Sequence, residues 1–268
     1  MTVSGLYIYP IKSCAPVAVS TATVERQGLR GDRRFMVVDH KGRFVTARTQ
    51  PRLVLVASTL DDDALTIRAP GMAPVRVDLA RIEAGYRDVS VWRDSLAARS
   101  CGPEAARLFS DYLGGDYALV HKDAATVRPG KSGGEVSFAD AHPLLVLSDA
   151  SVDELNARLA RPVDRLNFRP NICLSGLPPG GEDRLARLTV GSVTLQAAGP
   201  CSRCVLTTVD PATGAKDPHG EPMRTLGTFR RGADRRIYFG QNMAPLGAGV
   251  IALGNVAAGD APVPAGAS

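Results

Sequence analysis

The sequence predicts a mainly β protein with a few helices, which belongs to the α+β class. Short runs of β-branched and aromatic residues recur along the chain, and glycine and proline turn signals separate them. Two stretches have the apolar spacing of a helix. With 268 residues, of which 44% are hydrophobic and 22% charged, the chain is long enough for one large or two small domains with a sizeable core.

The first half of the chain is expected to form a meander or barrel of short strands. The turn at His40–Gly42 lies between two β-prone runs and predicts a hairpin. The expected strands are Leu6–Tyr9, Val17–Val24, Arg34–Asp39, Arg43–Ala47, Leu53–Thr59, Ala64–Ala69, Val75–Leu79 and Val89–Trp92.

Two helices are predicted from their ends and their spacing. The first, Pro103–Leu113, begins with a proline and stops at a glycine pair, and its apolar residues share one face. The second begins near Ser151, where Glu154 completes a capping box, and runs to Leu159 before Pro162.

The second half is expected to begin after the charged, glycine-containing loop Lys122–Gly134, which is a candidate domain boundary. The last residues, Ala261–Ser268, have the composition of a frayed tail. The expected strands of this half are Leu144–Leu147, Ala186–Val190, Val193–Gln196, Val205–Val209 and Val250–Leu253.

Composition excludes several classes of protein. The net charge of +5 comes without a polybasic block and aromatic residues make up 5%, so a nucleic-acid partner is not expected. No apolar run approaches the roughly 20 residues that span a bilayer, so no membrane partner is expected. The N-terminus has no secretory pattern, which makes the cytoplasm the default location.

The pair in Cys201–Cys204 (CSRC) is the sharpest motif, and the residues alone leave its role open. A zinc site would need a second pair of ligands, and the four histidines are dispersed. A thioredoxin-like dithiol would begin a helix, whereas the β-branched run Val205–Val209 predicts a strand. Two inert buried thiols, or one thiolate bound to a soft metal beside Arg203, remain possible readings.

Two further clusters carry polar residues in positions that suit an anion. In Asn167–Asn171 (NFRPN), Pro170 fixes the backbone after Arg169, whose guanidinium can bind phosphate in a bidentate manner. In Tyr9–Cys14 (YPIKSC), a lysine and a hydroxyl follow a strand end. Each cluster taken alone also fits an ordinary solvated loop, and no phosphate-binding glycine loop is present.

Taken together and in this order, the clusters resemble the MOSC family, the molybdenum cofactor sulfurase C-terminal domain proteins. The branch that the chain resembles has an N-terminal MOSC-associated β-barrel and includes the mitochondrial amidoxime-reducing component and bacterial hydroxylaminopurine-detoxifying relatives. The resemblance covers nearly the whole chain. The segments that carry it are Tyr9–Cys14, Gly28–Phe35, Val45–Arg48, Pro51–Leu53, Asn167–Asn171, Cys201–Pro211, Phe239–Gln241 and Gly259–Asp260.

The resemblance implies specific roles for residues. In that family the second cysteine of the motif binds molybdenum, which the dithiolene of a phosphorylated pterin also holds. Cys204 is therefore implied as metal ligand and catalytic residue, and Asp140 as a nearby carboxylate that relays protons. The implied cofactor-binding residues are Lys12, Ser13, Arg34, Arg169, Asn171 and Asn242, the last at a position where mitochondrial members carry an aromatic residue.

The resemblance also implies an architecture and an activity. Residues 1–122 would form the N-terminal β-barrel domain, packed on a MOSC β-barrel at 123–263, with 264–268 as a flexible tail. The expected activity is reduction of N-hydroxylated small molecules by a bound molybdenum cofactor. Electrons would come from a separate flavin or iron–sulfur partner, because the chain has no cysteines after Cys204 and no iron–sulfur cluster is expected in it. The alternative is a carrier of the cofactor, or of its sulfur, without reductase activity.

Overall fold

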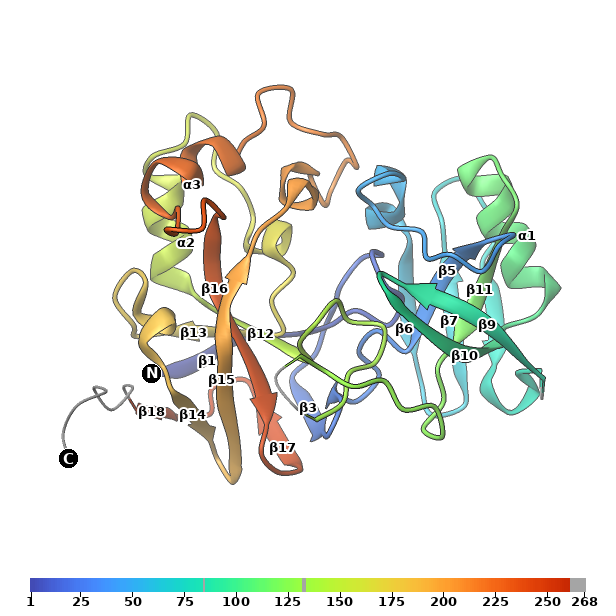
Figure 1. The fold of residues 1–268 in the computed structure, drawn as a ribbon, viewed down its shortest axis with the longest axis horizontal. Helices are drawn as coiled ribbons and strands as arrows, with labels where there is room; N and C mark the ends of the chain where they lie inside the picture. The colour runs from blue at the N-terminus through green and yellow to red at the C-terminus, as the bar shows by residue number, and fades with distance from the viewer. Residues whose placement is uncertain (84, 132–133, 261–268) are drawn as a thin grey trace.

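The structure is a computed structural model, and it describes residues 1–83, 85–131 and 134–260. Figure 1 shows two lobes, one built around β5 to β11 with α1 and the other around β12 to β18 with α2 and α3. Strands dominate both lobes, which confirms the predicted mainly β architecture with a few helices.

The largest sheet has eight strands and includes the start of the chain. Its second strand from one edge, β1, pairs antiparallel with β13, so the first residues of the chain lie in the sheet of the second lobe. In spatial order the strands are β18 (Ala257–Asp260), β14 (Arg187–Val190), β15 (Val193–Ser202), β16 (Tyr238–Pro245), β12 (Leu144–Ser148), β13 (Ile172–Ser175), β1 (Thr2–Ile8) and β2 (Val17–Ala18).

Three smaller sheets complete the fold. The antiparallel ladder between β17 and β3 joins an element near the C-terminus to one near the N-terminus. The first of these sheets contains, in spatial order, β5 (Phe35–Asp39), β11 (Tyr117–His121), β10 (Asp94–Ser100) and β9 (Tyr86–Val91). The second contains β17 (Gly249–Ala252), β3 (Thr21–Glu25) and β4 (Gly28–Leu29). The third contains β6 (Ala57–Leu60), β7 (Ala64–Arg68) and β8 (Val75–Asp78).

The helices follow the local signals of the sequence. Helix α1 (Pro103–Leu113) begins with its proline and ends at Gly114, which adopts the left-handed conformation that L side chains disfavour. Helix α2 (Asp149–Asn156) begins two residues before the predicted start. The remaining helices are α3 (Met223–Phe229) and the short 3₁₀ segments η1 (Pro51–Leu55), η2 (Leu79–Arg81), η3 (Arg165–Phe168), η4 (Gly181–Arg184) and η5 (Val205–Thr208).

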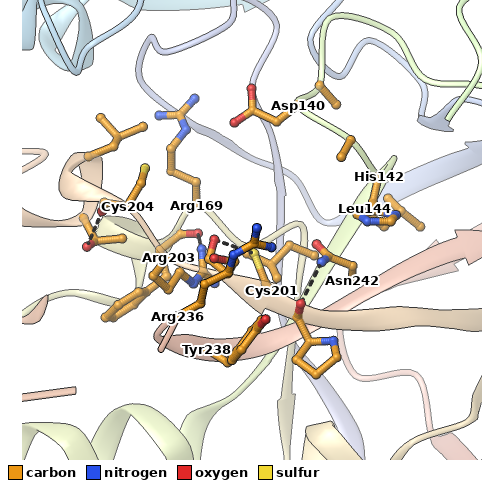
Figure 2. Close-up of a pocket in the computed structure, with 18 of the residues that line it drawn as sticks. Asp140, His142, Leu144, Arg169, Cys201, Arg203, Cys204, Arg236, Tyr238 and Asn242 are labelled. Carbon is orange, nitrogen blue, oxygen red and sulfur yellow. Dashed lines mark hydrogen bonds between the residues drawn. The ribbon is translucent and has the colours of Figure 1, made fainter. Parts of the chain in front are cut away.

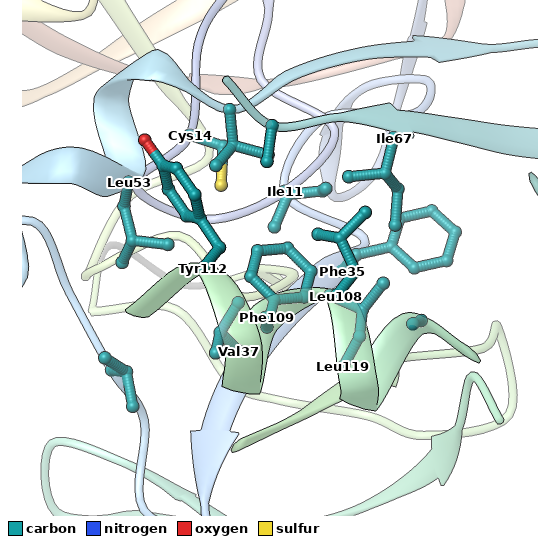
Figure 3. Close-up of a cluster of buried hydrophobic side chains, with 14 of the residues drawn as sticks. Ile11, Cys14, Phe35, Val37, Leu53, Ile67, Leu108, Phe109, Tyr112 and Leu119 are labelled. Atoms are coloured by element: carbon teal, nitrogen blue, oxygen red, sulfur yellow. The ribbon is translucent and has the colours of Figure 1, made fainter. Parts of the chain in front are cut away.

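The first lobe has a compact apolar core beneath α1. Figure 3 shows Phe109 and Leu108 of the helix near Phe35 of β5, and Leu53 of η1 beside Tyr112, all nearly or fully buried. Val209, from the second half of the sequence, joins the same cluster. Burial of a side chain of this size stabilises a fold by about 1.5–3 kcal/mol, so this core fixes the position of the loops around it.

Several sequence-based expectations need correction or restriction; the predicted strand Leu53–Thr59, for example, begins as the 3₁₀ segment η1, and β6 starts only at Ala57. The predicted strand Val205–Val209 is wrong, because these residues form η5, in which the Cys204 carbonyl accepts hydrogen bonds from the backbone and the hydroxyl of Thr207. The hydroxyl of Thr208 likewise returns to a backbone carbonyl, so local side-chain bonds override the strand propensity of a β-branched run. The predicted tail 264–268 lies outside the described residues.

The predicted hairpin around His40–Gly42 is present, with Val45 donating to the Val37 carbonyl across it. The boundary predicted at residue 122 stays a prediction. Within the described ranges, none of the helices combines the length and the apolar character needed to cross a membrane.

Candidate functional site

A cavity of about 810 Å³ opens between segments from both halves of the sequence (Figure 2). Five residues of the wall come from the first half, namely Lys12, Ser13, Arg33, Thr46 and Arg48, and the rest comes from residues 131–242. The structure brings seven of the predicted site residues to this one cavity. They are Lys12, Ser13, Asp140, Arg169, Asn171, Cys204 and Asn242.

Asp140 and Lys12 form a tight ion pair at the cavity wall. Lys12 is only 5% exposed, and its Nζ donates to the Phe138 carbonyl at 2.7 Å and to Asp140 Oδ1 at 2.5 Å. Arg48 Nη2 donates to the other carboxylate oxygen at 3.3 Å, and Trp92 Nε1 donates to Oδ1 at 3.1 Å.

These contacts set the charge of the carboxylate. Removal from bulk water would by itself raise the pKa of Asp140, but the Lys12 ammonium, the Arg48 guanidinium and the Trp92 indole N–H outweigh that effect and hold the pKa well below its usual range. Asp140 is therefore ionised at neutral pH. It can accept a proton during a reaction, but it does not carry one at rest.

Two guanidinium groups enclose the ring of Tyr9 next to this pair. The Arg169 and Arg33 guanidinium carbons lie 4.1 and 4.3 Å from the ring centroid, and Tyr9 itself is fully buried. Arg33 has a carboxylate partner, Asp32, at 2.5 Å. Arg169 donates from Nη1 to the Cys14 carbonyl at 2.8 Å, and burial lowers its pKa to about 10.

Strained backbone conformations gather at the same place. Ser13, Arg33 and Arg169 line the cavity, and all three have positive φ angles, of 69°, 49° and 55°. Such conformations cost of order 1–3 kcal/mol for residues other than glycine and cluster at functional sites. The three strained residues thus coincide with the cavity wall, where their side chains lie.

The side chains of Asn171 and Asn242 form hydrogen bonds to neighbouring segments of the protein. Asn171 Oδ1 accepts from Arg33 Nη1 at 3.0 Å and from the Leu145 backbone N–H at 3.2 Å, while Nδ2 donates to the Tyr7 carbonyl at 3.1 Å. Asn242 Nδ2 donates to the Pro200 carbonyl at 3.3 Å. Asn171 is thus a brace that holds Arg33 against β1 and β12.

Arg34, the remaining member of the predicted set, does not line the cavity, and its role in binding the cofactor stays a prediction. Its guanidinium donates to Glu25 Oε2 at 2.7 Å and to Gln27 Oε1, and Arg33 takes the place at the cavity wall. Arg33 and Arg34 are adjacent at the entry to β5, so their side chains leave in different directions. The sequence does not reveal which of the two arginines faces the site.

Cys201 lies at the end of β15 and Cys204 lies just after it, at the start of η5, and both line the cavity. Between them, Arg203 donates from Nε to the Phe239 carbonyl at 2.7 Å and from Nη1 to the Phe168 carbonyl at 2.9 Å, which anchors this segment to β16 and η3. Burial raises the pKa of the Cys201 thiol, which favours its neutral form.

The residues of the wall fit an anionic ligand that carries a metal. Seven Lys or Arg residues line the cavity, against two Asp. In the part of the chain that the structure describes, the Nη2 atoms of Arg169 and Arg203 are buried without a hydrogen-bond partner, and a ligand oxygen would satisfy such donors. In the same part, His, Cys, Asp and Glu nowhere gather in threes as a metal site would need, so a metal at Cys204 requires ligands from outside the chain.

Sequence reasoning missed Trp92, the single tryptophan of the chain, as a neighbour of the site. Its ring lies under the Arg48 guanidinium at 4.4 Å and beside the Phe44 ring at 5.0 Å. The residue ends a predicted strand, and only the pairing of distant segments brings it to Asp140. No local signal could have identified it.

Comparisons with known proteins cover both halves of the chain. Residues 1–116 match the family described as MOSC N-terminal beta barrel domain, and residues 133–262 match the MOSC domain.

Among individual proteins, mitochondrial amidoxime reducing component 2 of Bos taurus is 35% identical over 275 residues, which cover 97% of this chain and 82% of that protein. Mitochondrial amidoxime-reducing component 1 of Mus musculus is 37% identical over 276 residues, covering 95% and 81%. The Homo sapiens component 1 is 36% identical over 281 residues with the same coverage. The chain therefore belongs to the MOSC-domain family, together with the mitochondrial amidoxime-reducing components.

Proposed function

We propose that this protein binds a molybdenum cofactor through Cys204 and reduces N-hydroxylated small molecules, such as hydroxylamines, amidoximes and N-hydroxylated bases. The observation that carries the proposal is one cavity that holds Cys204 together with two buried guanidinium groups, Arg169 and Arg203, each with a donor left over. The names of the relatives, which are amidoxime-reducing components, support the substrate class.

Different residues of the cavity would bind the metal and the phosphate of the cofactor. Cys204 would supply a thiolate to the metal. Arg169, Arg33, Lys12 and Ser13 would bind the pterin phosphate, because cationic and hydroxyl donors form charge-assisted bonds with phosphate oxygens. The bound molybdenum would supply the two-electron chemistry. Wall residues would exclude bulk water from the reacting N–O bond.

The reaction breaks the N–O bond of the substrate. Two electrons and two protons are consumed, the oxygen leaves as water, and an amidoxime becomes an amidine. The electrons would come from a separate flavin or iron–sulfur protein. Asp140, held ionised by Lys12 and Arg48, would pass protons from solvent toward the leaving oxygen.

The test begins with metal content and continues with turnover. The protein is purified from a host that makes the cofactor, and molybdenum is measured by elemental analysis in wild type, Cys204→Ser and the matched control Cys201→Ser. We expect molybdenum in wild type and in Cys201→Ser, and its loss in Cys204→Ser. Absence of the metal from wild type, or equal content in all three proteins, would refute the assignment.

Turnover separates a reductase from a carrier. Reduced viologen serves as artificial electron donor and benzamidoxime as substrate, and benzamidine is measured as product. A reductase forms benzamidine in proportion to its molybdenum content. A cofactor or sulfur carrier would hold molybdenum and form no benzamidine.

The cytoplasmic location expected from the sequence stays a prediction.

A further inference from the structure

A tight turn between α3 and β16 forms one part of the cavity wall. The turn is closed by an isolated bridge between Arg231 and Ile237 and by hydrogen bonds from Gly232 N to the Arg236 carbonyl at 2.8 Å and from Arg235 N to the Gly232 carbonyl at 2.9 Å. Four of its residues line the cavity, namely Gly232, Ala233, Asp234 and Arg236.

Asp234 gives this turn its shape. Its Oδ1 accepts from the Arg236 backbone N–H at 3.1 Å, and its Oδ2 accepts from the Tyr238 hydroxyl at 2.6 Å. One carboxylate therefore joins the turn to the first residue of β16. A turn held in this way can present a side chain in a defined direction.

The turn lies directly beside the motif that carries Cys204. The Arg203 backbone N–H donates to the Ile237 carbonyl at 2.8 Å, and Tyr238 pairs with Ser202 across the β15–β16 ladder. Figure 2 shows Arg236 and Tyr238 in the same close-up as Cys201 and Asn242. Arg236 and Cys204 therefore line the same cavity.

Asp234 neutralises the charge of Arg236 only weakly. Its Nε lies 3.6 Å from Asp234 Oδ2, and the two side chains are 70% and 46% exposed. Exposed pairs at this distance contribute little, because water screens them and the carboxylate already accepts two other hydrogen bonds. In contrast, Lys12 and Arg48 share Asp140, and Arg33 is paired with Asp32.

We propose that Arg236 selects substrates that carry an anionic group, a carboxylate or a phosphate, at the end opposite the reducible N–O bond. The inference rests on the proposed reductase function and adds a substrate class to it. The exposed guanidinium at the cavity wall would bind the part of the substrate that remains nearest to solvent. Arg is the side chain best suited to both acid groups.

The experiment compares three amidoximes that differ in one substituent. They are benzamidoxime, its 4-carboxy derivative and its 4-aminomethyl derivative, which are neutral, anionic and cationic at neutral pH. The readout is kcat/KM for each compound with the molybdenum-loaded protein and an artificial donor. We expect wild type to prefer the carboxylate, and the preference to fall as salt is added.

The variants assign that preference to one side chain. Arg236→Gln is expected to lower the ratio of kcat/KM for the carboxylate to that for benzamidoxime by about 10-fold, the size of one charge-assisted hydrogen bond at a partly solvated site. Arg236→Lys keeps the charge and should restore part of the ratio. Arg235→Gln is the matched control, since Arg235 neighbours Arg236 on the same turn but does not line the cavity.

Two results would overturn the inference. An equal ratio in wild type and Arg236→Gln would mean that Arg236 does not recognise the anion. An equal loss in Arg235→Gln would mean that overall surface charge, rather than one side chain, creates the preference. Reduction of none of the three amidoximes by molybdenum-loaded wild type would refute the reductase function itself and this inference with it.

Discussion

Arg169 and Arg33 enclose the same tyrosine ring, yet removal of Arg33 should destabilise the protein far more than removal of Arg169. Arg33 is paired with the nearly fully buried Asp32, whose other oxygen accepts the Tyr9 backbone N–H at 2.8 Å. Arg169 has no carboxylate within 4.0 Å among the described residues. We therefore compare Arg169→Met with Arg33→Met in cofactor-free protein.

The magnitudes follow from these contacts. Arg33→Met leaves a buried carboxylate without its counter-charge, which costs about 3–5 kcal/mol. Arg169→Met removes a hydrogen bond to the Cys14 carbonyl, worth about 1.5–3 kcal/mol, and a cation–π contact of about 1–2 kcal/mol. It also removes the desolvation penalty of an unpaired buried charge, which is several kcal/mol. The net change for Arg169→Met is expected to lie within about 2 kcal/mol of zero.

The assay is thermal and urea unfolding of both variants, prepared from a host that lacks the cofactor. For a domain of about 200 residues, 1 kcal/mol shifts Tm by about 2–4 °C, so Arg33→Met should lose about 10 °C and Arg169→Met at most a few degrees. Protein from a cofactor-competent host supplies the second readout, because Arg169→Met should fail to retain molybdenum. Equal destabilisation by both substitutions, or full molybdenum retention in Arg169→Met, would refute the reasoning that Arg169 is held ready for an anion.

Two further predictions concern single titratable groups. Burial lowers the pKa of His121 to about 4, whereas the usual pKa of histidine is about 6.5. Below pH 6.5 the folded state therefore binds fewer protons than the unfolded state. The free energy of unfolding should fall by up to about 3 kcal/mol as pH drops from about 6.5 to about 4. Urea unfolding across this range checks the slope, which His121→Gln should remove; an unchanged slope in that variant would contradict the assignment. Asp140→Asn deprives the buried Lys12 of its counter-charge and should lower the free energy of unfolding by about 2 kcal/mol. In the native state the same substitution should alter the fluorescence of Trp92, whose indole loses a charged acceptor, and identical spectra would argue against that hydrogen bond.

What could be predicted from the sequence depends on how local the signal is. Helix α1 was predictable because its proline start, glycine stop and apolar face all lie within a dozen residues. The segment Val205–Val209 was not, because hydroxyl groups of Thr207 and Thr208 close a 3₁₀ turn that propensity alone does not reveal. Strand propensity is easily overridden by such local bonds.

The same difference between local and long-range signals applies to the residues of the site. Cys204, Arg169 and Lys12 lie far apart in the sequence, and only the family resemblance indicated that they meet in one cavity. The sequence gives no local signal that separates Arg33, which lines the cavity, from Arg34, which bonds to Glu25 and Gln27. Trp92 contacts Asp140, which lies 48 residues later in the chain.

The ladder between β1 and β13 has a consequence for synthesis of the chain on the ribosome. Leu6 pairs with Ile172 and Thr2 with Ser175, so the first strand to be made waits for a partner that follows more than 160 residues later. At about 5–20 residues per second this wait lasts roughly 10–30 s. Until then β1 has only its short ladder with β2, and Val3 and Leu6 have no sheet to cover them.

Contacts of such large sequence separation form late, because loop-closure entropy must be overcome first. The N-terminal residues are thus the first to emerge from the ribosome, yet they can enter the sheet only after β13 has been made. Deletion of Thr2–Ile8 would leave β13 with one unpaired edge, so these seven residues stabilise a strand that lies more than 160 residues further along the chain.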